Sequence, residues 1–428
     1  MGYVAVRGGG RAIEESLKLL EYERVSTSSA WGTDEIEGTF PELVDQVMGE
    51  ASLYAPRLAA LALKQAQGSP DEAVFLLRAF RSTLERPYVS RTVDTGRMRV
   101  ARRVSAAFKD VPGGQMLGST RDYSHRLLAF DLETEGKEEL AEKRAELAAH
   151  FDGAVILGEA DAVCGVEGSH VAAAESLTVD TAGDPSTPRQ RRSAQDGNAA
   201  APAHSAILPR VLDYLRGQGL IAQVASDDAQ PVDATMAPLT FPAPRSVRLQ
   251  TLARGMTQAV EALGYAAIRG FGPAHPTVGE LRFGCVDVAV DHPLEPGGPE
   301  DAYYLGSIPV TEVESVFMAE RGEGADGAPS AAAPDADGLS LAVGYGLVLG
   351  RAETKAIAMS VLDRCLDLGD KRYPTEDEEF VLYHVDGVEA TGFISHLKLP
   401  HYVTFQSKLS SVRGTREEGK GSPDAAAL

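Results

Sequence analysis

Cysteine is scarce in this sequence, with three residues in a chain of 428. Cys164, Cys285 and Cys365 lie far apart and are odd in number, which indicates neither a disulfide framework nor a C-x-x-C metal motif. Such usage is typical of the reducing cytoplasm, where isolated thiols serve as small buried side chains. We therefore predict a cytoplasmic protein without a disulfide framework.

Long apolar runs are also absent. No run approaches the ~18 apolar residues of a membrane-spanning helix, and the opening M-G-Y-V-A-V-R-G-G-G lacks the basic and apolar regions of a secretory signal. The Met-Gly start matches the beginning of a myristoylation motif, but Val6 stands where that motif has Ser or Thr. We expect no membrane attachment.

Positive charge is in deficit, because 41 Lys and Arg residues oppose 62 Asp and Glu residues and leave a net charge of −21. Affinity for nucleic acid comes largely from Lys and Arg side chains that meet phosphates. The balance therefore argues against general nucleic-acid binding, and a polyanionic ligand would need a local basic pocket.

What the chain does contain is ordinary for a globular protein, with 43% hydrophobic and 24% charged residues. Its length allows roughly two or three domains. We expect an α+β fold with a helical N-terminal region, a mixed α/β C-terminal module and two low-complexity insertions. The expected regions are 1–130, mainly helical with a basic glycine-rich loop; 131–205, a charged helix and a disordered insertion; 206–321, an α/β middle region; 322–338, a low-complexity insertion; 339–411, the C-terminal module; and 412–428, a disordered tail.

Hydrophobic periodicity supplies the main elements. Residues 39–84 have helical spacing, and Gly68-Ser69-Pro70-Asp71 separates two of the helices with turn and cap chemistry. Strands are expected at 285–290, within 302–318 and at 339–350, where glycines indicate that another element approaches the backbone. A helix is expected over 351–366, and the F-V-L-Y run at 380–383 is expected to be a short strand.

The segment Arg91–Arg126 is basic inside an acidic chain, with eight Lys or Arg residues and three Asp residues. A basic helix that leads into Pro112-Gly113-Gly114 would suit phosphate or triphosphate recognition, because Arg offers forked donors and glycine lets the backbone approach a ligand. A solvated helix face, or a docking surface for an acidic partner, explains the charge equally well. The candidate triphosphate residues are Arg102, Arg103, Lys109, Gly113, Gly114, Tyr123 and His125.

The stretch from His384 to Val403 is the richest in possible metal ligands, since it holds three of the nine histidines. His396 and His401 have a spacing used by zinc sites. Side chains five apart on a continuous helix point roughly 140° from one another, but Pro400 interrupts the helix and lets the two rings converge. Zinc usually takes three or four protein ligands, so the remainder must come from a distant residue, water, substrate or a second chain. The alternative is two ordinary histidines hydrogen-bonded near a helix end.

Several stretches together resemble one family, the I subunit (PhnI) of the bacterial carbon–phosphorus lyase core complex. The resemblance lapses across about Asp131–Ser205, in the second low-complexity insertion and in the tail. The matching motifs are Y-V-A-V-R-G-G at Tyr3, A-L-K-Q-A at Ala62, V-F-L-L-R-A-F-R at Val74, F-K-D-V-P-G-G-Q-M-L-G-S-T-R-D-Y-S-H-R-L-L at Phe108, H-P-T-V-G-E-L-R-F-G at His275, G-Y-G-L-V-L-G at Gly344 and V-E-A-T-G-F-I-S-H-L-K-L-P-H-Y-V at Val388.

This resemblance implies an enzyme subunit of phosphonate catabolism that works with G, H and J partner subunits in a two-fold hetero-oligomer. The family displaces adenine from MgATP by an alkylphosphonate and forms α-D-ribose 1-methylphosphonate 5-triphosphate, whereas the subunit alone resembles a nucleosidase. The family's paired zinc-binding histidines fall on His396 and His401. Two alternatives stay open, namely a non-catalytic scaffold subunit and a self-contained metal-dependent hydrolase.

Breaking an N-glycosidic bond builds positive charge on the sugar and negative charge on the departing purine. The reaction calls for carboxylates near the sugar and a proton donor near the base. Asp386 and Glu389 are our candidates for the first role, and His384 is our candidate for the second.

Overall fold

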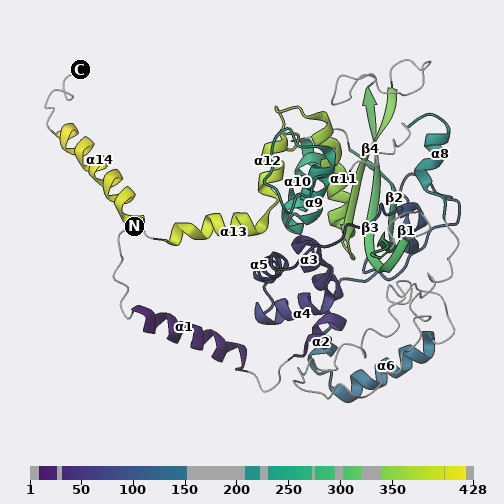
Figure 1. Cartoon of the computed structure of the whole chain (residues 1–428), viewed down its shortest axis with the longest axis horizontal. Helices are drawn as coiled ribbons and strands as arrows, with labels where there is room; N and C mark the ends of the chain where they lie inside the picture. Colours follow the sequence, from purple (N-terminus) through teal and green to yellow (C-terminus); the bar gives the residue numbers. More distant parts are fainter. Residues whose placement is uncertain are drawn as a thin grey trace. The chain divides into compact units, whose positions relative to one another are not determined.

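The computed structural model describes residues 9–26, 31–151, 208–221, 230–271, 275–294, 302–320, 339–399 and 401–420. It divides the chain into two compact units, of which one is Thr33–Val385 and the other joins Met1–Gly32 with Asp386–Leu428. Helices combine with an antiparallel sheet, so the predicted α+β class is confirmed (Figure 1). Residues 152–205 of the first predicted insertion and all of 322–338 lie outside the described residues.

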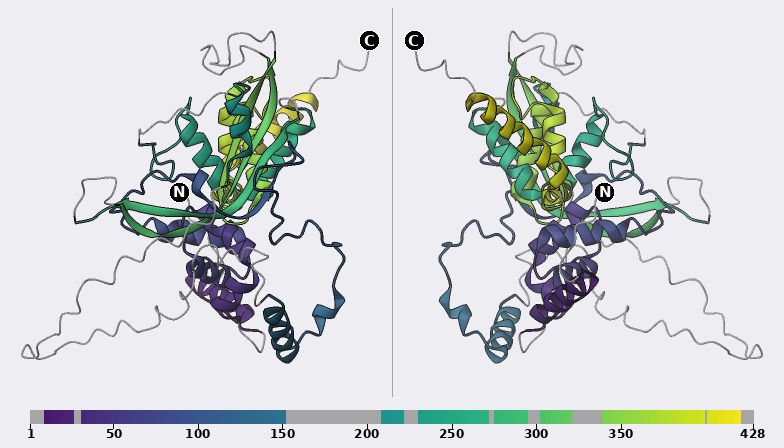
Figure 2. Two further views of the ribbon diagram at one scale, coloured as in Figure 1. Left: turned by 90° about the vertical axis from the view of Figure 1, so that its right-hand side faces the viewer. Right: turned by 90° about the vertical axis from the view of Figure 1, so that its left-hand side faces the viewer.

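One antiparallel sheet organises the Thr33–Val385 unit, and its order β1-β2-β3-β4 follows the chain. The described strands are β1 (Arg99–Val104), β2 (Thr277–Asp291), β3 (Ala302–Glu320) and β4 (Leu339–Leu349). They include the strands predicted at 285–290, within 302–318 and at 339–350. Figure 2 shows one end of the long β2–β3 ribbon extending beyond the helices.

The main core lies between this sheet and helix α11 (Glu353–Leu368), which confirms the helix predicted at 351–366. Val313 and Val348 point from the strands toward Met359 and Leu362 of the helix, and all four are buried. Helices α9 (Arg245–Arg254), α10 (Thr257–Ala266) and α12 (Glu378–His384) lie on the same side of the sheet, and α8 (Val211–Gly217) lies on the other (Figure 1).

Two glycines of β4 allow α11 to approach the sheet closely. A Cβ atom on Gly344 would lie 1.9 Å from the Ser360 carbonyl oxygen, and one on Gly346 would lie 2.1 Å from the Ala356 carbonyl oxygen. Neither position has room for a side chain. The prediction that another element approaches the backbone of this strand is therefore confirmed.

The helical spacing predicted over residues 39–84 is confirmed by three helices, α3 (Pro41–Ala51), α4 (Pro56–Gln65) and α5 (Pro70–Arg81). Each helix begins with proline, whose fixed φ and missing N–H suit the first turn. Ser69 caps α5 by accepting a hydrogen bond from the Glu72 backbone N–H. The prediction that residues 68–71 separate two helices and cap the second one is therefore confirmed.

The remaining described elements are shorter or lie toward the ends of the chain. In order they are α1 (Gly9–Arg24), α2 (Thr33–Thr39), η1 (Thr95–Arg97), η2 (Phe130–Glu133), α6 (Lys137–Phe151), the π-helical η3 (Ala267–Phe271), α13 (Gly387–Ser395), η4 (His396–Lys398) and α14 (Tyr402–Lys420). Helix α6 is the charged helix expected near the start of the 131–205 region.

Three expectations differ from the structure. The F-V-L-Y run belongs to helix α12, because Asp377 caps it by accepting from the Phe380 N–H and its apolar side chains Val381 and Leu382 enter the core. Residues 412–420 continue α14, so the predicted disordered tail is wrong for that part. The basic stretch at 99–104 is strand β1 rather than a helix, because its arginines pair with acids of neighbouring segments.

We predict that Gly344→Ala destabilises the protein by about 1–3 kcal/mol or more, because the added methyl group must push α11 away from β4. Gly38→Ala is the matched control, since nothing lies within 4 Å of its built Cβ in helix α2. Unfolding by urea, followed by circular dichroism, measures both free energies. Equal midpoints for Gly344→Ala and wild type would contradict this account of the sheet–helix contact.

Candidate functional site

His396 and His401 lie close together where the predicted turn breaks the helix. Helix α13 ends at Ser395, the short η4 follows, and α14 begins at Tyr402. The two imidazole centroids are 5.4 Å apart, with ring planes at 68°. Two imidazoles on one tetrahedral zinc, with metal–nitrogen distances of about 2.0–2.1 Å, have centroids roughly 5 Å apart. The pair therefore fits joint coordination.

Both rings are also oriented by the backbone. Nδ1 of His396 hydrogen-bonds the Phe393 carbonyl oxygen, and Nδ1 of His401 hydrogen-bonds the Leu399 carbonyl oxygen at 2.6 Å. When Nδ1 donates, the lone pair of a neutral imidazole is on Nε2, as in metal-binding histidines. Ordinary histidines at a helix end can make the same bonds, so the ring spacing is what favours a metal.

The described residues do not supply a third ligand. They contain no group of three or more His, Cys, Asp or Glu side chains that could hold a metal ion. A zinc ion on this pair would need completion by water, substrate, a partner chain or a residue outside the described ranges. His401 is exposed and His396 is half-buried, so neither ring is enclosed by the described residues.

The three candidate catalytic residues have different surroundings. His384 ends α12, where Nδ1 hydrogen-bonds the Phe380 carbonyl oxygen at 2.6 Å and the ring lies 4.4 Å from the Phe380 ring. Asp386 caps α13 by accepting from the backbone N–H groups of Val388 and Glu389, both at 3.1 Å. The Glu389 side chain is exposed on the first turn. His384 belongs to one unit, whereas Asp386 and Glu389 belong to the other.

Arg102 and Arg103 are used inside the protein. The Arg102 guanidinium donates to Glu353 and Asp122, both at 2.6 Å, and to the Leu117 carbonyl. Arg103 is fully buried and donates to Glu280 at 2.6 Å and to the carbonyl oxygens of Pro112 and Pro209. Their donors therefore hold the strand, the glycine turn and the α8 segment together, and do not face a ligand surface.

The other candidate triphosphate residues lie on the surface. Gly113 and Gly114 both have positive φ, +84° and +77°, in a turn that Arg103 holds through the Pro112 carbonyl. A Cβ on Gly113 would meet Leu208 at 2.5 Å, so this position requires glycine. The side chains of Lys109, Tyr123 and His125 are exposed. These three side chains are thus open to solvent, whereas the two arginines are not.

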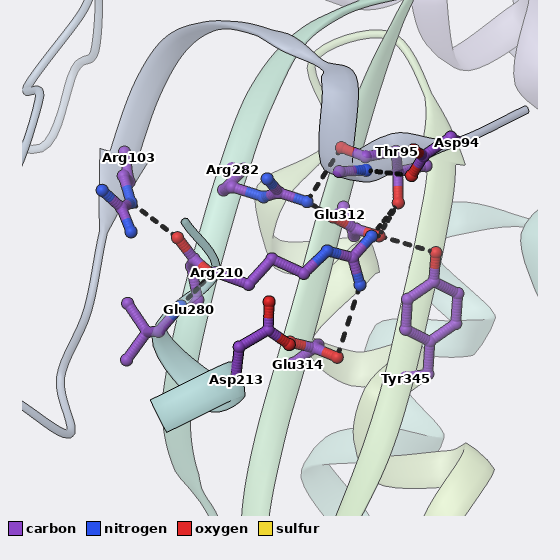
Figure 3. A network of polar contacts seen from close by, with 12 residues as sticks. Asp94, Thr95, Arg103, Arg210, Asp213, Glu280, Arg282, Glu312, Glu314 and Tyr345 are labelled. Carbon is purple, nitrogen blue, oxygen red and sulfur yellow. Dashed lines mark hydrogen bonds and ion pairs between the residues drawn. The ribbon is translucent and has the colours of Figure 1, made fainter. Parts of the chain in front are cut away.

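A buried polar network, absent from our sequence predictions, covers the α8 side of the sheet (Figure 3). Its centre is Glu312 of β3, which is 3% exposed. Its carboxylate accepts from Thr95 Oγ1 at 2.6 Å, Tyr345 Oη at 2.9 Å and Arg210 at 3.2 Å, and also from Arg282. Four donors from four segments of chain thus converge on one carboxylate.

The register of β2 and β3 explains why further arginines enter the network. Arg282 lies opposite Glu312, but Glu280 lies opposite Glu314, which places like charges side by side. Arg103 pairs with Glu280 at 2.6 Å, and Arg216 pairs with Glu314 at 2.5 Å. Each buried glutamate therefore has a guanidinium partner, as buried carboxylates require.

The charge states follow from these contacts. Burial by itself raises the pKa of the Glu312 carboxyl, but Arg282, Arg210 and the Thr95 hydroxyl lower it on balance. Burial, together with the Glu312 charge, raises the pKa of the Tyr345 phenol. Tyr345 consequently stays protonated, and its hydroxyl donates a hydrogen bond to the ionised carboxylate of Glu312.

Comparison with known proteins gives a match over nearly the whole chain. The model of the family "Bacterial phosphonate metabolism protein (PhnI)" matches residues 2–419. The chain belongs to the PhnI family. Curated relatives include the α-D-ribose 1-methylphosphonate 5-triphosphate synthase subunit PhnI of Escherichia coli (strain K12), 38% identical, with 97% of this chain and 99% of the relative covered.

Two further curated relatives have similar identity. The corresponding synthase subunit of Rhizobium meliloti (strain 1021) is 39% identical, with 97% of this chain and 95% of the relative covered. A protein named putative C-P lyase subunit protein HtxH, of Stutzerimonas stutzeri, is 40% identical, with 99% and 98% covered. Among the described helices, none has the length and apolar character needed to cross a membrane.

One signal in the sequence could have revealed the buried network of this PhnI-family chain. The motif H-P-T-V-G-E-L-R-F-G contains Glu280 and Arg282 within a strand, two residues apart and therefore on one face. Charges that alternate with apolar residues at period two usually indicate a solvated face. Only the segments packed over this face show that it is buried.

We predict that Glu312→Gln lowers the free energy of unfolding at pH 7 by about 3–5 kcal/mol, because the buried arginines lose their carboxylate. Since the folded-state pKa of Glu312 is lowered, its stabilisation is present above the unfolded pKa of about 4.3 and is lost as pH falls through the folded pKa. The difference between wild type and variant should therefore shrink in acid.

Urea unfolding at a series of pH values measures this difference. Glu142→Gln, on the exposed surface of α6, is the control and should change stability by less than about 0.5 kcal/mol. A Glu312→Gln protein as stable as the control at pH 7 would show that the network is not a stabilising centre.

Proposed function

We propose that this chain is a subunit of a carbon–phosphorus lyase core complex in the cytoplasm. With G, H and J partner subunits it replaces the adenine of MgATP by a phosphonate, and the product is α-D-ribose 1-methylphosphonate 5-triphosphate. The observation that carries the proposal is similarity, over nearly full length, to two relatives named as subunits of the synthase that makes this compound.

The reaction is a substitution at C1′ of the ribose. A phosphonate oxygen forms a bond to C1′, while the bond from C1′ to adenine breaks and its electron pair leaves with the base, which then takes up a proton. Positive charge builds on the sugar in the transition state, so a nearby carboxylate lowers the barrier. Without phosphonate, water can take the place of the attacking oxygen, which corresponds to nucleosidase activity.

We assign roles to the three candidate catalytic residues between α12 and α13 according to which of their side-chain atoms are already hydrogen-bonded. Glu389 presents an exposed carboxylate that can stabilise the sugar. Asp386 caps α13 with its carboxylate and so holds Glu389 at the start of the helix. His384 has Nδ1 engaged by the Phe380 carbonyl, which leaves Nε2 for proton transfer to the base.

For the triphosphate we propose the glycine turn and three exposed side chains. Lys109, Tyr123 and His125 offer exposed donors, and the Gly113-Gly114 backbone lets a phosphate approach. Arg102 and Arg103 are positioning residues here, because their guanidinium groups hold the turn and the strand rather than the ligand. Mg²⁺ would arrive with ATP as part of the substrate.

For zinc we propose His396 and His401, completed from outside the described residues of this chain. The ring spacing and the two anchored Nδ1 atoms support this assignment. A bound zinc ion acts as a Lewis acid that polarises an oxygen ligand. This chain's own residues fix the two imidazoles before the ion binds, since backbone carbonyls set their orientation.

A non-catalytic scaffold subunit is the second candidate. It is favoured by α1, which has no buried residue and exposes Ile13, Leu17 and Leu20. Such faces suit assembly with other chains.

Adenine release separates the two candidates. We predict that the purified full-length chain, given MgATP, liberates adenine, and that the complex with its partners and methylphosphonate forms the phosphonate ester instead. Chromatography of the products measures both. Glu389→Gln should lower adenine release at least tenfold, whereas Glu379→Gln, an exposed glutamate of α12, should not. No adenine from either preparation would favour the scaffold.

We also predict that His396→Ala and His401→Ala each remove zinc from the assembled complex and block growth on methylphosphonate as sole phosphorus source. This chain supplies two imidazole ligands to the proposed zinc ion, so the loss of either histidine removes half of the ligands that the chain provides. Lys398→Ala, between them in η4, is the matched control and should keep the metal. Metal analysis of the purified complexes is the primary readout. Full zinc occupancy in both histidine variants would show that the pair is structural.

A further inference from the structure

Helix α11 buries a lysine that the proposed reaction does not use. Lys355 is 2% exposed, and its ammonium group donates to the Gly255 backbone carbonyl at 2.7 Å. Burial lowers the pKa of this amine to about 8, although the nearby Glu50 carboxylate raises it, so the group is still charged at pH 7. An apolar side chain could fill the same space without the cost of burying a charge. The position therefore indicates a role for the charge itself.

That role concerns the end of helix α9. The last carbonyl groups of a helix have no partner within it and carry partial negative charge. Arg78 of α5 donates to the Arg254 carbonyl at 3.2 Å, and Lys355 donates to the Gly255 carbonyl that follows. Two cations from two other helices thus hold the end of α9 in place.

The start of helix α10 is held in the complementary way. Glu50 of α3 accepts from the Thr257 backbone N–H at 2.9 Å and from its hydroxyl at 2.8 Å. The Met256 backbone N–H donates to the Val385 carbonyl at 2.6 Å. The short joint between α9 and α10, residues 254–257, is consequently bonded to α3, α5, α11 and the residue that follows α12.

The joint also receives the side chain of Val385. This side chain is fully buried in the main core, and a Cβ atom on Gly255 would lie 2.9 Å from the Val385 Cβ. Val385 directly follows His384 in the chain, and it is the last residue of the Thr33–Val385 unit. The joint therefore fixes the backbone at the point where the chain leaves this unit.

We propose that Lys355 and Gly255 are positioning residues for His384. Lys355 holds the Gly255 carbonyl, and the joint in turn holds both the carbonyl and the side chain of Val385. This arrangement fixes the end of α12, from which His384 would give a proton to the departing base. The inference rests on the proposed function for the role of His384. A misplacement of about 1 Å can lower a rate about a hundredfold, so such support affects catalysis.

Hydrogen exchange of the full-length chain, measured by mass spectrometry, tests the mechanical part. Lys355→Met keeps the apolar stem and removes the ammonium group. Exchange should become about tenfold faster in the segments 252–258 and 380–386, because both lose support, whereas residues 311–316 of β3 should keep the wild-type rate. Thr354→Val is the matched control, since it removes an exposed hydrogen bond from α11 to Glu261 of α10 and should change neither segment.

Faster exchange in 252–258 with no change in 380–386 would overturn the proposal, as would wild-type exchange in both. Gly255→Ala provides the same test if Lys355→Met does not fold. The backbone of Gly255, with φ −60° and ψ 155°, suits alanine, so the change acts through the methyl group that meets Val385. Exchange in 380–386 should again be about tenfold faster. Gly38→Ala is the control, and a wild-type rate in Gly255→Ala would also overturn the proposal.

Adenine release from MgATP tests the catalytic part. Lys355→Met and Gly255→Ala should each lower kcat about tenfold and leave KM within about twofold, because His384 acts in the transition state and not in substrate binding. A raised KM with an unchanged kcat would refute the positioning role. If the wild-type chain releases no adenine, the proposed function and the role of His384 both fail, while hydrogen exchange still decides whether the joint holds Val385.

Discussion

The buried carboxylate of Glu312 is the contact on which the α8 side of the protein depends. It receives donors from η1, β2, β4 and the start of α8, which are distant in sequence. Burying a carboxylate is costly unless each oxygen is paired, so this arrangement forms only when all four segments are in place. The network therefore fixes one packing of the sheet and excludes partly assembled alternatives.

The opposite side of the sheet is held by shape rather than charge. Gly344 and Gly346 bring β4 into contact with α11, whose apolar residues complete the main core. The two sides thus use different physics, close packing on one and paired charges on the other. Three of the arginines in the basic segment Arg91–Arg126 therefore face the interior. Arg99, Arg102 and Arg103 form ion pairs with acidic side chains of the same chain.

The second unit, which joins Met1–Gly32 with Asp386–Leu428, has a different balance. Helices α1 and α14 present apolar side chains to solvent, and the histidine pair lies between α13 and α14. The proposed zinc site has two ligands among the described residues, so its remaining ligands must come from elsewhere.

The sequence by itself determined the α+β class, the helices within residues 39–84, strands β3 and β4 with part of β2, and the closeness of His396 to His401. These features depend on local chemistry, namely apolar periodicity, prolines and caps at helix starts, and the presence of a proline in the sequence between two histidines. Family motifs also identified the chain from sequence. Only the tertiary structure decided that Arg102 and Arg103 are buried, that F-V-L-Y is helical and that Glu312 gathers four donors. A charge on a strand has the same local pattern whether it meets water or a partner distant in sequence, so long-range packing alone settles its role.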